Sequence, residues 1–475
     1  MVTDAIIASA PGKVLLTGGY LVLEQAFSGL VIGTSARFYT AIQPDEHHNS
    51  NLITVRSPQF ENATWQYQVL SSGGLKLEAV KSETQNKFIE TCLRFTLEVI
   101  YQRIDPASFE SFLSKGVIVT IVGDNDFYSQ RAQLDTKGLP NTADSLASLE
   151  PFCKTHATLS TVHKTGLGSS AALTTSLVAA LLLHFKVVSD SLVEREKKLI
   201  HNVAQYVHCF AQGKVGSGFD VSSAVWGSHR YRRFNPSILT PIMDKKVDSK
   251  TLSNTLDADN QSWDNDVYPF TLPPGFDLML ADIDAGSHTP TLVGKVLGWK
   301  KSKPEEAESL WSNLGKYNSL VEQHFRNLAE LFENKREQYD ETIRACAQLK
   351  TTEWHTVEGP VAEEMVGLVQ DFDQVRALLR EMSRLSEVPI EPAEQTKLLD
   401  ACMNVPGVAM AGVPGAGGFD AIFCIVLSDQ SKSDVRQVWQ SWKELSVGPL
   451  LSQADSNGVT SVRLDSVPAL VRVLR

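Results

Sequence analysis

Hydrophobic and polar residues alternate in short runs through the first half of the chain, which is the pattern of half-buried β-strands. Gly, Pro, Asn and Asp bound these runs, and a further strand-like run, Ala157–Val162, precedes a glycine-rich loop. Two longer runs have helical composition, Lys87–Tyr101 and Leu173–Phe185. The predicted strands are Lys13–Leu16, Leu30–Ile42, Leu52–Val55 and Val117–Val122.

The second half is dominated by helical periodicity. Val361–Leu385 is a predicted helix, while Asp277–Ile283 and Ala421–Leu427 are predicted buried strands. Helices and strands interleaved in two halves predict an α+β fold. Apolar residues at spacings of three and four predict one more long helix with a single buried stripe, formed by Leu310, Leu314, Tyr317, Val321, Phe325, Leu328 and Leu331.

Two long polar segments interrupt these patterns. Asp124–Pro151 is rich in turn-forming residues, and we expect a lid or an inserted arm there. The stretch from Asn235 to about Pro274 is rich in Asp, Asn, Ser and Pro, which favours a boundary. We therefore predict an N-terminal domain over residues 1–235, a polar linker or insert over 236–274, and a C-terminal domain over 275–475.

Composition narrows the class of protein. The 475 residues include 44 Lys+Arg and 55 Asp+Glu, a net charge of −11, which argues against nucleic-acid or anionic-membrane binding as the main task. The most apolar stretch, Leu177–Phe185, is far shorter than the roughly 20 residues of a membrane span. Six cysteines without a CxxC pair indicate reduced thiols, and the N-terminus lacks a signal-peptide pattern. We predict a cytoplasmic monomer or homodimer that acts on small molecules.

The clearest chemical motif is KTGLGSSAAL at Lys164–Leu173, a glycine-rich loop that opens a helix. Glycines at 166 and 168 let the backbone turn its amides inward, and the helix start attracts phosphate oxygens. Either serine could cap the helix, and one hydroxyl could bind Mg²⁺. The same residues could also form a tight turn that binds no ligand.

A dinucleotide-binding interpretation of this loop is also open. Gly166, Gly168 and Ala171 fit a G-x-G-x-x-A fingerprint, and Asp190 follows at about the spacing of a ribose-binding acid. Lys164 and Thr165, however, stand where such a fingerprint usually has an apolar strand. The chain contains no GxxxxGK[ST] phosphate loop.

Three more elements accompany this loop. Lys13 lies beside a tight turn in APGKVLLTGGYLVLE. Asp220 follows the flexible turn GSG after an apolar, histidine-containing helix at Leu199–Phe210. Gly412–Gly418 leads into the predicted strand at 421–427. Taken singly, these elements fit a surface lysine, a helix-capping aspartate and a strand-entry turn, respectively. Their combination in this order is more specific than any one of them.

In this order the motifs resemble those of the GHMP kinase superfamily. The first motif matches Pro11-Gly12-Lys13, the second Gly166–Ala172 and the third Gly412–Gly418. Longer pieces resemble the phosphomevalonate kinases of fungal and plant type, from Ser9 to about Leu427. These pieces are SAPGKVLLTGGYLVLE, SPQF, GDNDFYSQ, KTGLGSSAA, KVGSGFDVSSAVWGS and GAGGFDAIF.

The resemblance implies a ribosomal-protein-S5-like N-terminal domain and a ferredoxin-like C-terminal domain. It implies ATP-dependent phosphorylation of 5-phosphomevalonate to 5-diphosphomevalonate, in the mevalonate route to isoprenoids and sterols. Lys13 and Asp220 would be catalytic, and Ser170 would hold Mg²⁺. The implied ATP-binding residues are Lys164, Thr165, Gly166, Leu167, Gly168, Ser169, Ser170, Ala171 and Ala172. The implied substrate-binding residues are Lys13, Tyr20, Ser217, Gly218, Ser287, Thr289, Gly415, Ala416 and Gly417.

Ser287 and Thr289 have a local basis as well. Thr289 before Pro290 is a good helix cap followed by a proline in the first turn, so free amides would face outward there. With Lys295, these residues could hold the phosphate or carboxylate of the acceptor. The same pattern also fits a well-capped helix without a ligand.

The chemistry of a phosphate acceptor limits the role of Asp220. A phosphate monoester has its second pKa near ~6, so the acceptor is largely dianionic at pH 7 and hardly needs a base. We expect Asp220 to position Lys13 and the metal, while Lys13 and Lys164 neutralise the transferring group. Mevalonate kinase carries a metal-binding glutamate on the helix before this aspartate, whereas HCFAQGKVGSGFD has His208 and Gln212 and no acid. A second carboxylate ligand for Mg²⁺ is therefore not identified.

Other functions stay open at this point. A mevalonate kinase or another GHMP kinase would use an alcohol acceptor. A dinucleotide-dependent oxidoreductase would use Gly166–Ala171 for its cofactor. A catalytically silent sensor would keep the kinase fold without turnover.

Overall fold

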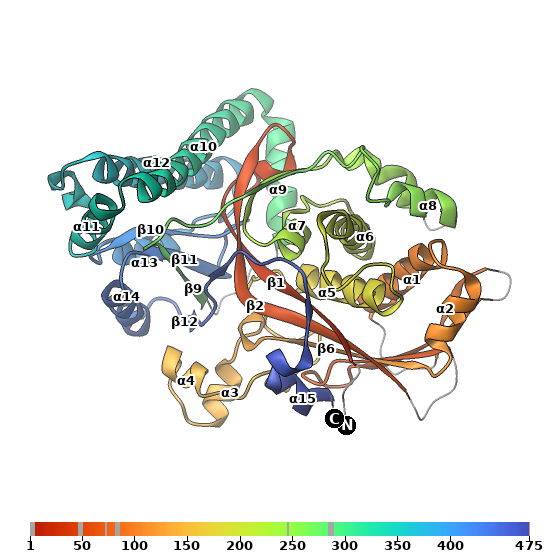
Figure 1. The fold of residues 1–475 in the computed structure, drawn as a ribbon. Helices are drawn as coiled ribbons and strands as arrows, with labels where there is room; N and C mark the ends of the chain where they lie inside the picture. Colours follow the sequence, from red (N-terminus) through yellow and green to blue (C-terminus); the bar gives the residue numbers. More distant parts are fainter. Residues whose placement is uncertain are drawn as a thin grey trace.

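The computed structural model describes residues 5–45, 51–71, 74–80, 86–244, 247–283 and 289–474. Within these residues two β-sheets each carry helices, as Figure 1 shows. The larger sheet has ten strands. They are β1 (Ile6–Thr17), β2 (Ser28–Pro44), β3 (Leu52–Arg56), β4 (Thr64–Leu70), β5 (Lys76–Ala79), β6 (Val117–Gly123), β7 (His229–Arg232), β8 (Asp266–Pro269), β13 (Ala454–Asp455) and β14 (Thr460–Val462).

The main path of this sheet runs in the order β14-β1-β2-β6-β3-β4-β5, with β7 and β13 also paired to β2. The strands β1 and β2 form a long antiparallel hairpin, in which Lys13 stands opposite Gly33. Its register shifts between Pro11 and Lys13, so the hairpin is irregular where the first glycine motif lies. The pair β3 and β6 is parallel.

A layer of helices packs on the larger sheet. The central helix α5 contacts both β1 and β2 and also packs against α1, α6 and α7. Its apolar residues lie all around the helix, which suits an element buried between a sheet and other helices. The helices of this part are α1 (Lys87–Tyr101), α2 (Pro106–Leu113), α3 (Arg131–Thr136), α4 (Ala143–Ala147), α5 (Ser169–His184), α6 (Glu194–Gln212), α7 (Phe219–Trp226) and α8 (Ser249–Thr255).

The smaller sheet is antiparallel, in the order β10-β11-β9-β12. Its strands are β9 (Asp277–Ile283), β10 (Val408–Gly412), β11 (Ala421–Val426) and β12 (Val447–Leu450). The long helices α10 and α12 lie side by side next to it (Figure 1). The remaining α-helices of the described residues are α9 (Thr289–Ser302), α10 (Pro304–Asn334), α11 (Arg336–Cys346), α12 (Pro360–Ser386), α13 (Ala393–Met403), α14 (Asp429–Ser441) and α15 (Pro468–Leu474), the last of which packs on the larger sheet. This mixture confirms the predicted α+β class.

One predicted strand is wrong. Residues 157–162 form turns instead, in which the Thr158 carbonyl accepts from the backbone amides of Thr161 and Val162. The hydroxyls of Thr158, Ser160 and Thr161 also bond to one another. Such local bonds offer the backbone an alternative to a sheet ladder. The glycine-rich loop is therefore not preceded by a strand.

The polar segment at 124–151 contains α3 and α4 and is anchored to the smaller sheet. Arg131 forms an ion pair with Asp282 of β9 and also donates to the Ser446 carbonyl oxygen at 3.0 Å. In this conformation the segment connects the two sheets. Whether it moves as a lid remains a prediction.

The end of the chain returns to the larger sheet. Strands β13 and β14 pair with β2 and β1, and Leu470 of α15 packs in the same cluster as Ile7. Strand β8, from the expected linker at 236–274, pairs with β7. Residues 236–274 and 275–475 thus each contribute strands to the larger sheet, and the predicted domain boundaries stay a prediction. No helix among the described residues is long and apolar enough to cross a membrane.

Candidate active site

The three glycine-rich motifs meet at β1. The Lys13 amide donates to the Leu167 carbonyl oxygen at 2.9 Å, and the Gly415 amide donates to the Leu15 carbonyl oxygen at 3.1 Å. Two of the motifs are therefore attached to β1 at residues 13 and 15, only two positions apart. Segments that are far apart in the sequence thus form one site.

The loop before α5 has the backbone of a phosphate-binding turn. Gly166 and Gly168 have φ angles of 80° and 79°, which glycine adopts without strain. Helix α5 begins at Ser169 and is 16 residues long, so its amides and dipole favour an anion at this end. A β-carbon at Gly168 would stand 3.0 Å from the aliphatic stem of Lys13. The glycine thus makes room for the lysine.

Lys13 is the cation at the centre of the site. Its ammonium group donates to the Gly166 carbonyl oxygen at 2.8 Å and lies 5.4 Å from the centre of the Phe219 ring. Burial lowers the pKa of Lys13, while the carboxylates of Asp220 and Asp420 raise it. One carboxylate belongs to α7 and the other precedes β11, so acids from both parts of the chain stabilise the ammonium charge.

Asp220 stands in the first turn of α7. One carboxylate oxygen accepts from the Val221 amide at 3.0 Å, and the other lies 3.8 Å from His208 Nε2. The preceding loop is held in place, because the Tyr231 hydroxyl donates to the Ser217 carbonyl oxygen at 2.7 Å. Arg233 donates to the Gly216 carbonyl oxygen at 2.6 Å. These bonds fix where α7 starts and so where Asp220 stands.

The third motif closes the site from the smaller sheet. The Tyr20 hydroxyl donates to the Ala416 carbonyl oxygen at 2.7 Å. A β-carbon at Gly19 would stand 2.3 Å from the Gly415 carbonyl oxygen, and one at Gly417 would stand 2.1 Å from the Ile390 carbonyl oxygen. The close approach of these backbones therefore requires glycine.

The remaining expected residues lie farther out. Ser287 is outside the described residues, as is the side chain of Thr289, the first residue of α9. Lys164 is exposed and forms an isolated bridge with Tyr128. Lys214 and Lys295 are also exposed.

Two residues near Lys13 were missed by the sequence interpretation. Asp420 lies beside the glycine-rich loop before α5, since its β-carbon is 3.9 Å from a β-carbon placed on Gly166. His208 is buried, with Nε2 3.0 Å from the Ser170 hydroxyl oxygen. Burial lowers the pKa of His208, and Asp220 raises it. The GGFD sequence could have indicated Asp420. His208 was noted only because it lies in the segment where a metal-binding acid was expected.

The donor set fits a magnesium ion together with a phosphate chain. Mg²⁺ prefers a few protein oxygens together with phosphate and water. Ser170 and Asp220 supply a hydroxyl and a carboxylate that both lie near His208 Nε2. Among the described residues there is no group of three His, Cys, Asp or Glu that could hold a metal alone.

The dinucleotide interpretation of the loop loses its support. Asp190 accepts a hydrogen bond from Ser461 at 2.9 Å and thus has a partner outside the loop. Residues 157–162, which would have to form the preceding strand, are turns.

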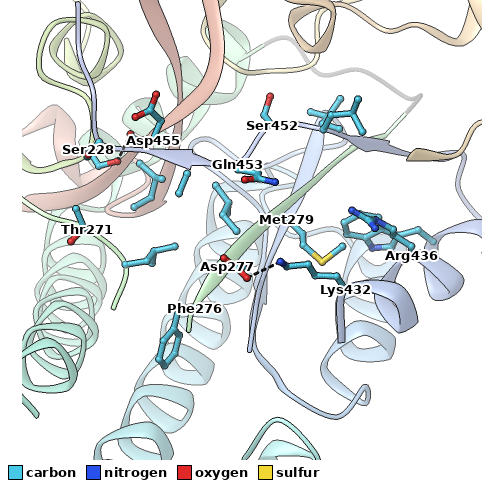
Figure 2. Close-up of a pocket in the computed structure, with 18 residues that line it drawn as sticks. Ser228, Thr271, Phe276, Asp277, Met279, Lys432, Arg436, Ser452, Gln453 and Asp455 are labelled. Atoms are coloured by element: carbon cyan, nitrogen blue, oxygen red, sulfur yellow. Dashed lines mark hydrogen bonds and ion pairs between the residues drawn. The ribbon is translucent and has the colours of Figure 1, made fainter. Parts of the chain in front are cut away.

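A cavity of about 290 Å³ lies elsewhere, between β13 and the start of β9 (Figure 2). None of the three glycine-rich motifs contributes to its walls. Lys432 at its edge is paired with Asp277 at 2.8 Å and with Asp429 at 2.9 Å. The charge of the Lys432 ammonium is thus compensated by two adjacent carboxylates.

Comparison with known proteins agrees with this geometry. The family model "GHMP kinases N terminal domain" matches residues 148–228, and "GHMP kinases C terminal" matches residues 363–447. The chain is 40% identical to "Phosphomevalonate kinase, peroxisomal" of Arabidopsis thaliana, over 96% of this chain and 95% of that protein. It is 37% identical to a phosphomevalonate kinase of Gibberella zeae, over 97% of each.

Solved structures share the fold at low identity. A Streptococcus pneumoniae phosphomevalonate kinase in complex with phosphomevalonate and AMPPNP has a TM-score of 0.58 and 14% identity, over 95% of this chain and 100% of that chain. The Lin0012 protein of Listeria innocua has a TM-score of 0.64 and 15% identity, over 97% and 99%.

Proposed function

The chain belongs to the GHMP kinase family, together with its phosphomevalonate kinases, and we propose that it transfers the γ-phosphoryl group of ATP to (R)-5-phosphomevalonate. The products are ADP and (R)-5-diphosphomevalonate, a step of the mevalonate route to isoprenoids and sterols. The observation that carries this proposal is nearly full-length identity of 40% to a relative of that name. The meeting of three glycine-rich motifs around Lys13 supports it.

We assign the binding of ATP to the start of α5. The triphosphate lies along Lys164–Ala172, where the turn at Gly166 and Gly168 and the helix dipole stabilise negative charge. The Lys13 ammonium, held at the Gly166 carbonyl oxygen, faces the same loop. It stabilises the charge that develops on the transferring phosphoryl group.

The acceptor phosphate does not need a strong base. Its second ionisation is near pH ~6, so at pH 7 the attacking oxygen already carries charge. The main barrier is the approach of two anions, which positive charge and donors lower. We assign Asp220 the role of holding Lys13 and the metal in place.

Mg²⁺ is the proposed metal, with Ser170 and Asp220 as its protein ligands. When bound, it neutralises charge on the phosphate chain. Tyr20, Ser217, Gly218, and Gly415 to Gly417 would contact the acceptor, since they border the same site. Ser287 and Thr289, at the start of α9, would hold its phosphate or carboxylate.

A coupled assay of ADP release tests this function. The purified protein is supplied with Mg²⁺ and ATP and with 5-phosphomevalonate, mevalonate, galactose or homoserine in parallel. ADP release with 5-phosphomevalonate alone is the expected result. Preferential ADP release with mevalonate or a sugar would show that the protein is a kinase with a different acceptor. Nucleotide binding without ADP release in any arm would indicate a catalytically silent sensor.

We also propose a cytoplasmic location and a monomeric or homodimeric state. All six cysteines are free thiols, as in a reducing compartment. The name of the Arabidopsis relative states a peroxisomal location, so a fluorescent fusion imaged with a peroxisomal marker decides between the two. Sedimentation velocity measures the oligomeric state.

A further inference from the structure

Three helices bring Ser170, His208 and Asp220 together beside the nucleotide loop. Ser170 stands in the first turn of α5, His208 near the end of α6 and Asp220 in the first turn of α7. His208 Nε2 lies 3.0 Å from Ser170 Oγ and 3.8 Å from an Asp220 carboxylate oxygen. His208 is only 4% exposed, so water does not compete for these contacts.

We propose that His208 is a positioning residue that turns the Ser170 hydroxyl so that its oxygen lone pairs face the phosphate and metal side of the loop. This inference rests on the proposed kinase function and assigns a role to a residue outside the three motifs. His208 does not contact the substrates in this role. It acts through Ser170.

The direction of the hydrogen bond follows from Gln212. The Gln212 amide nitrogen lies 3.1 Å from His208 Nε2 and 3.4 Å from Nδ1, so its shorter contact is to Nε2, and an amide NH₂ group can only donate. With the amide oriented in this way, His208 Nε2 is an acceptor and the ring proton sits on Nδ1. Nε2 has one lone pair, so the Ser170 hydroxyl and the Gln212 amide both donate to it and share it in a three-centre hydrogen bond. Both lone pairs of the Ser170 oxygen stay free for a cation.

This arrangement compensates for a missing acid. Mg²⁺ binds oxygen ligands in a demanding geometry, so a hydroxyl held in the correct rotamer binds better than one that rotates. The segment 208–220 contains no Asp or Glu before Asp220 itself. Because the segment offers no further carboxylate, the orientation of Ser170 matters more in this chain.

The test compares binding of a non-hydrolysable ATP analogue with Mg²⁺ and with EDTA, by calorimetry. His208→Phe removes the acceptor and keeps a ring, and His208→Gln restores an acceptor. His201→Phe is the matched control, because His201 lies on the same helix, is 1% exposed and bonds to Asn202. We expect His208→Phe to weaken binding with Mg²⁺ by about 10- to 100-fold, as losses of groups that orient metal ligands do.

The other arms are expected to differ. His208→Phe should leave binding in EDTA unchanged, His208→Gln should recover most of the Mg²⁺-dependent affinity, and His201→Phe should change neither. An equal loss with and without Mg²⁺, or the same loss in His201→Phe, would show a packing role and overturn the proposal.

A second measurement uses the unmodified protein. With ¹⁵N-labelled histidine, NMR should place the His208 ring proton on Nδ1, and His208→Gln identifies the signal by its disappearance. A proton on Nε2 would overturn the proposal even if His208→Phe fails to fold. Neither measurement involves the acceptor, so absence of 5-phosphomevalonate turnover would refute the proposed function and leave this inference standing.

Discussion

Replacing Lys13 and Asp220 separately distinguishes charge stabilisation from base catalysis. Lys13→Met removes the ammonium group but keeps an unbranched stem against Gly168. At a separation of about 4 Å and an effective dielectric constant of about 20, one charge pair contributes about 4 kcal/mol. Since ~1.4 kcal/mol corresponds to a factor of ten, kcat is expected to fall about 10³-fold.

Asp220→Asn should cost less, because it leaves Lys13 anchored to the Gly166 carbonyl oxygen. The variant loses one of the two carboxylates that stabilise the Lys13 charge and keeps Asp420. The expected loss in kcat is about 10- to 100-fold, corresponding to ~1.4 to ~2.8 kcal/mol.

The pH profile provides the second measurement. If the acceptor phosphate attacks in its ionised form without a base, the fall in kcat/KM below pH ~6 reflects protonation of the substrate phosphate. This acid limb of the profile should then persist in Asp220→Asn. Lys13→Arg is the matched control, because it keeps the positive charge. A fall in Asp220→Asn as severe as in Lys13→Met, together with loss of one basic group from the profile, would show that Asp220 is a general base and refute the reasoning.

Three further predictions concern stability and the acceptor side of the site. Gly218 has a φ of 84°, and its β-carbon would stand 2.8 Å from the Gln205 side-chain oxygen, so Gly218→Ala should lower the unfolding free energy by about 1–3 kcal/mol in urea titrations. Burial raises the pKa of Asp124 to about 7, so its ionisation opposes folding as pH rises. The unfolding free energy of Asp124→Asn should match that of the wild type near pH 4 and exceed it by at most about 4 kcal/mol near pH 7. A difference in unfolding free energy that stays the same between about pH 4 and pH 7 would contradict this prediction. Tyr20→Phe removes the bond to the Ala416 carbonyl oxygen, so it should cost about 1 kcal/mol and raise KM for the acceptor more than KM for ATP in steady-state kinetics.

Local signals in the sequence predicted most of the elements. Lys87–Tyr101 and Asp277–Ile283 have the same bounds in the structure as in the prediction. Both carry a strong pattern, a helical stripe in one and a buried apolar run in the other. The strand pattern of Ala157–Val162 is weaker. There the hydroxyls of Thr158 and its neighbours form local hydrogen bonds, which stabilise turns instead of a strand. The prediction thus failed where side chains compete with the backbone ladder.

The sequence pattern did not predict the long-range contacts. Nothing in the composition of β13 or β14 indicates that these short strands pair with β2 and β1, because such pairing depends on where the rest of the chain has already placed the sheet edge. Asp420 was missed for a related reason. Its place beside Gly166 exists only after β11 has joined the smaller sheet.

The chain carries a net negative charge, whereas the start of α5 and the Lys13 ammonium provide positive potential beside the glycine-rich loop. A net charge of −11 would repel ATP and a phosphorylated acceptor at a distance. Close to the site, the start of α5 and the Lys13 ammonium provide positive potential where their neighbours limit screening by water. Asp220 and Asp420 favour the charged form of Lys13, because they raise its pKa and so offset part of the lowering by burial.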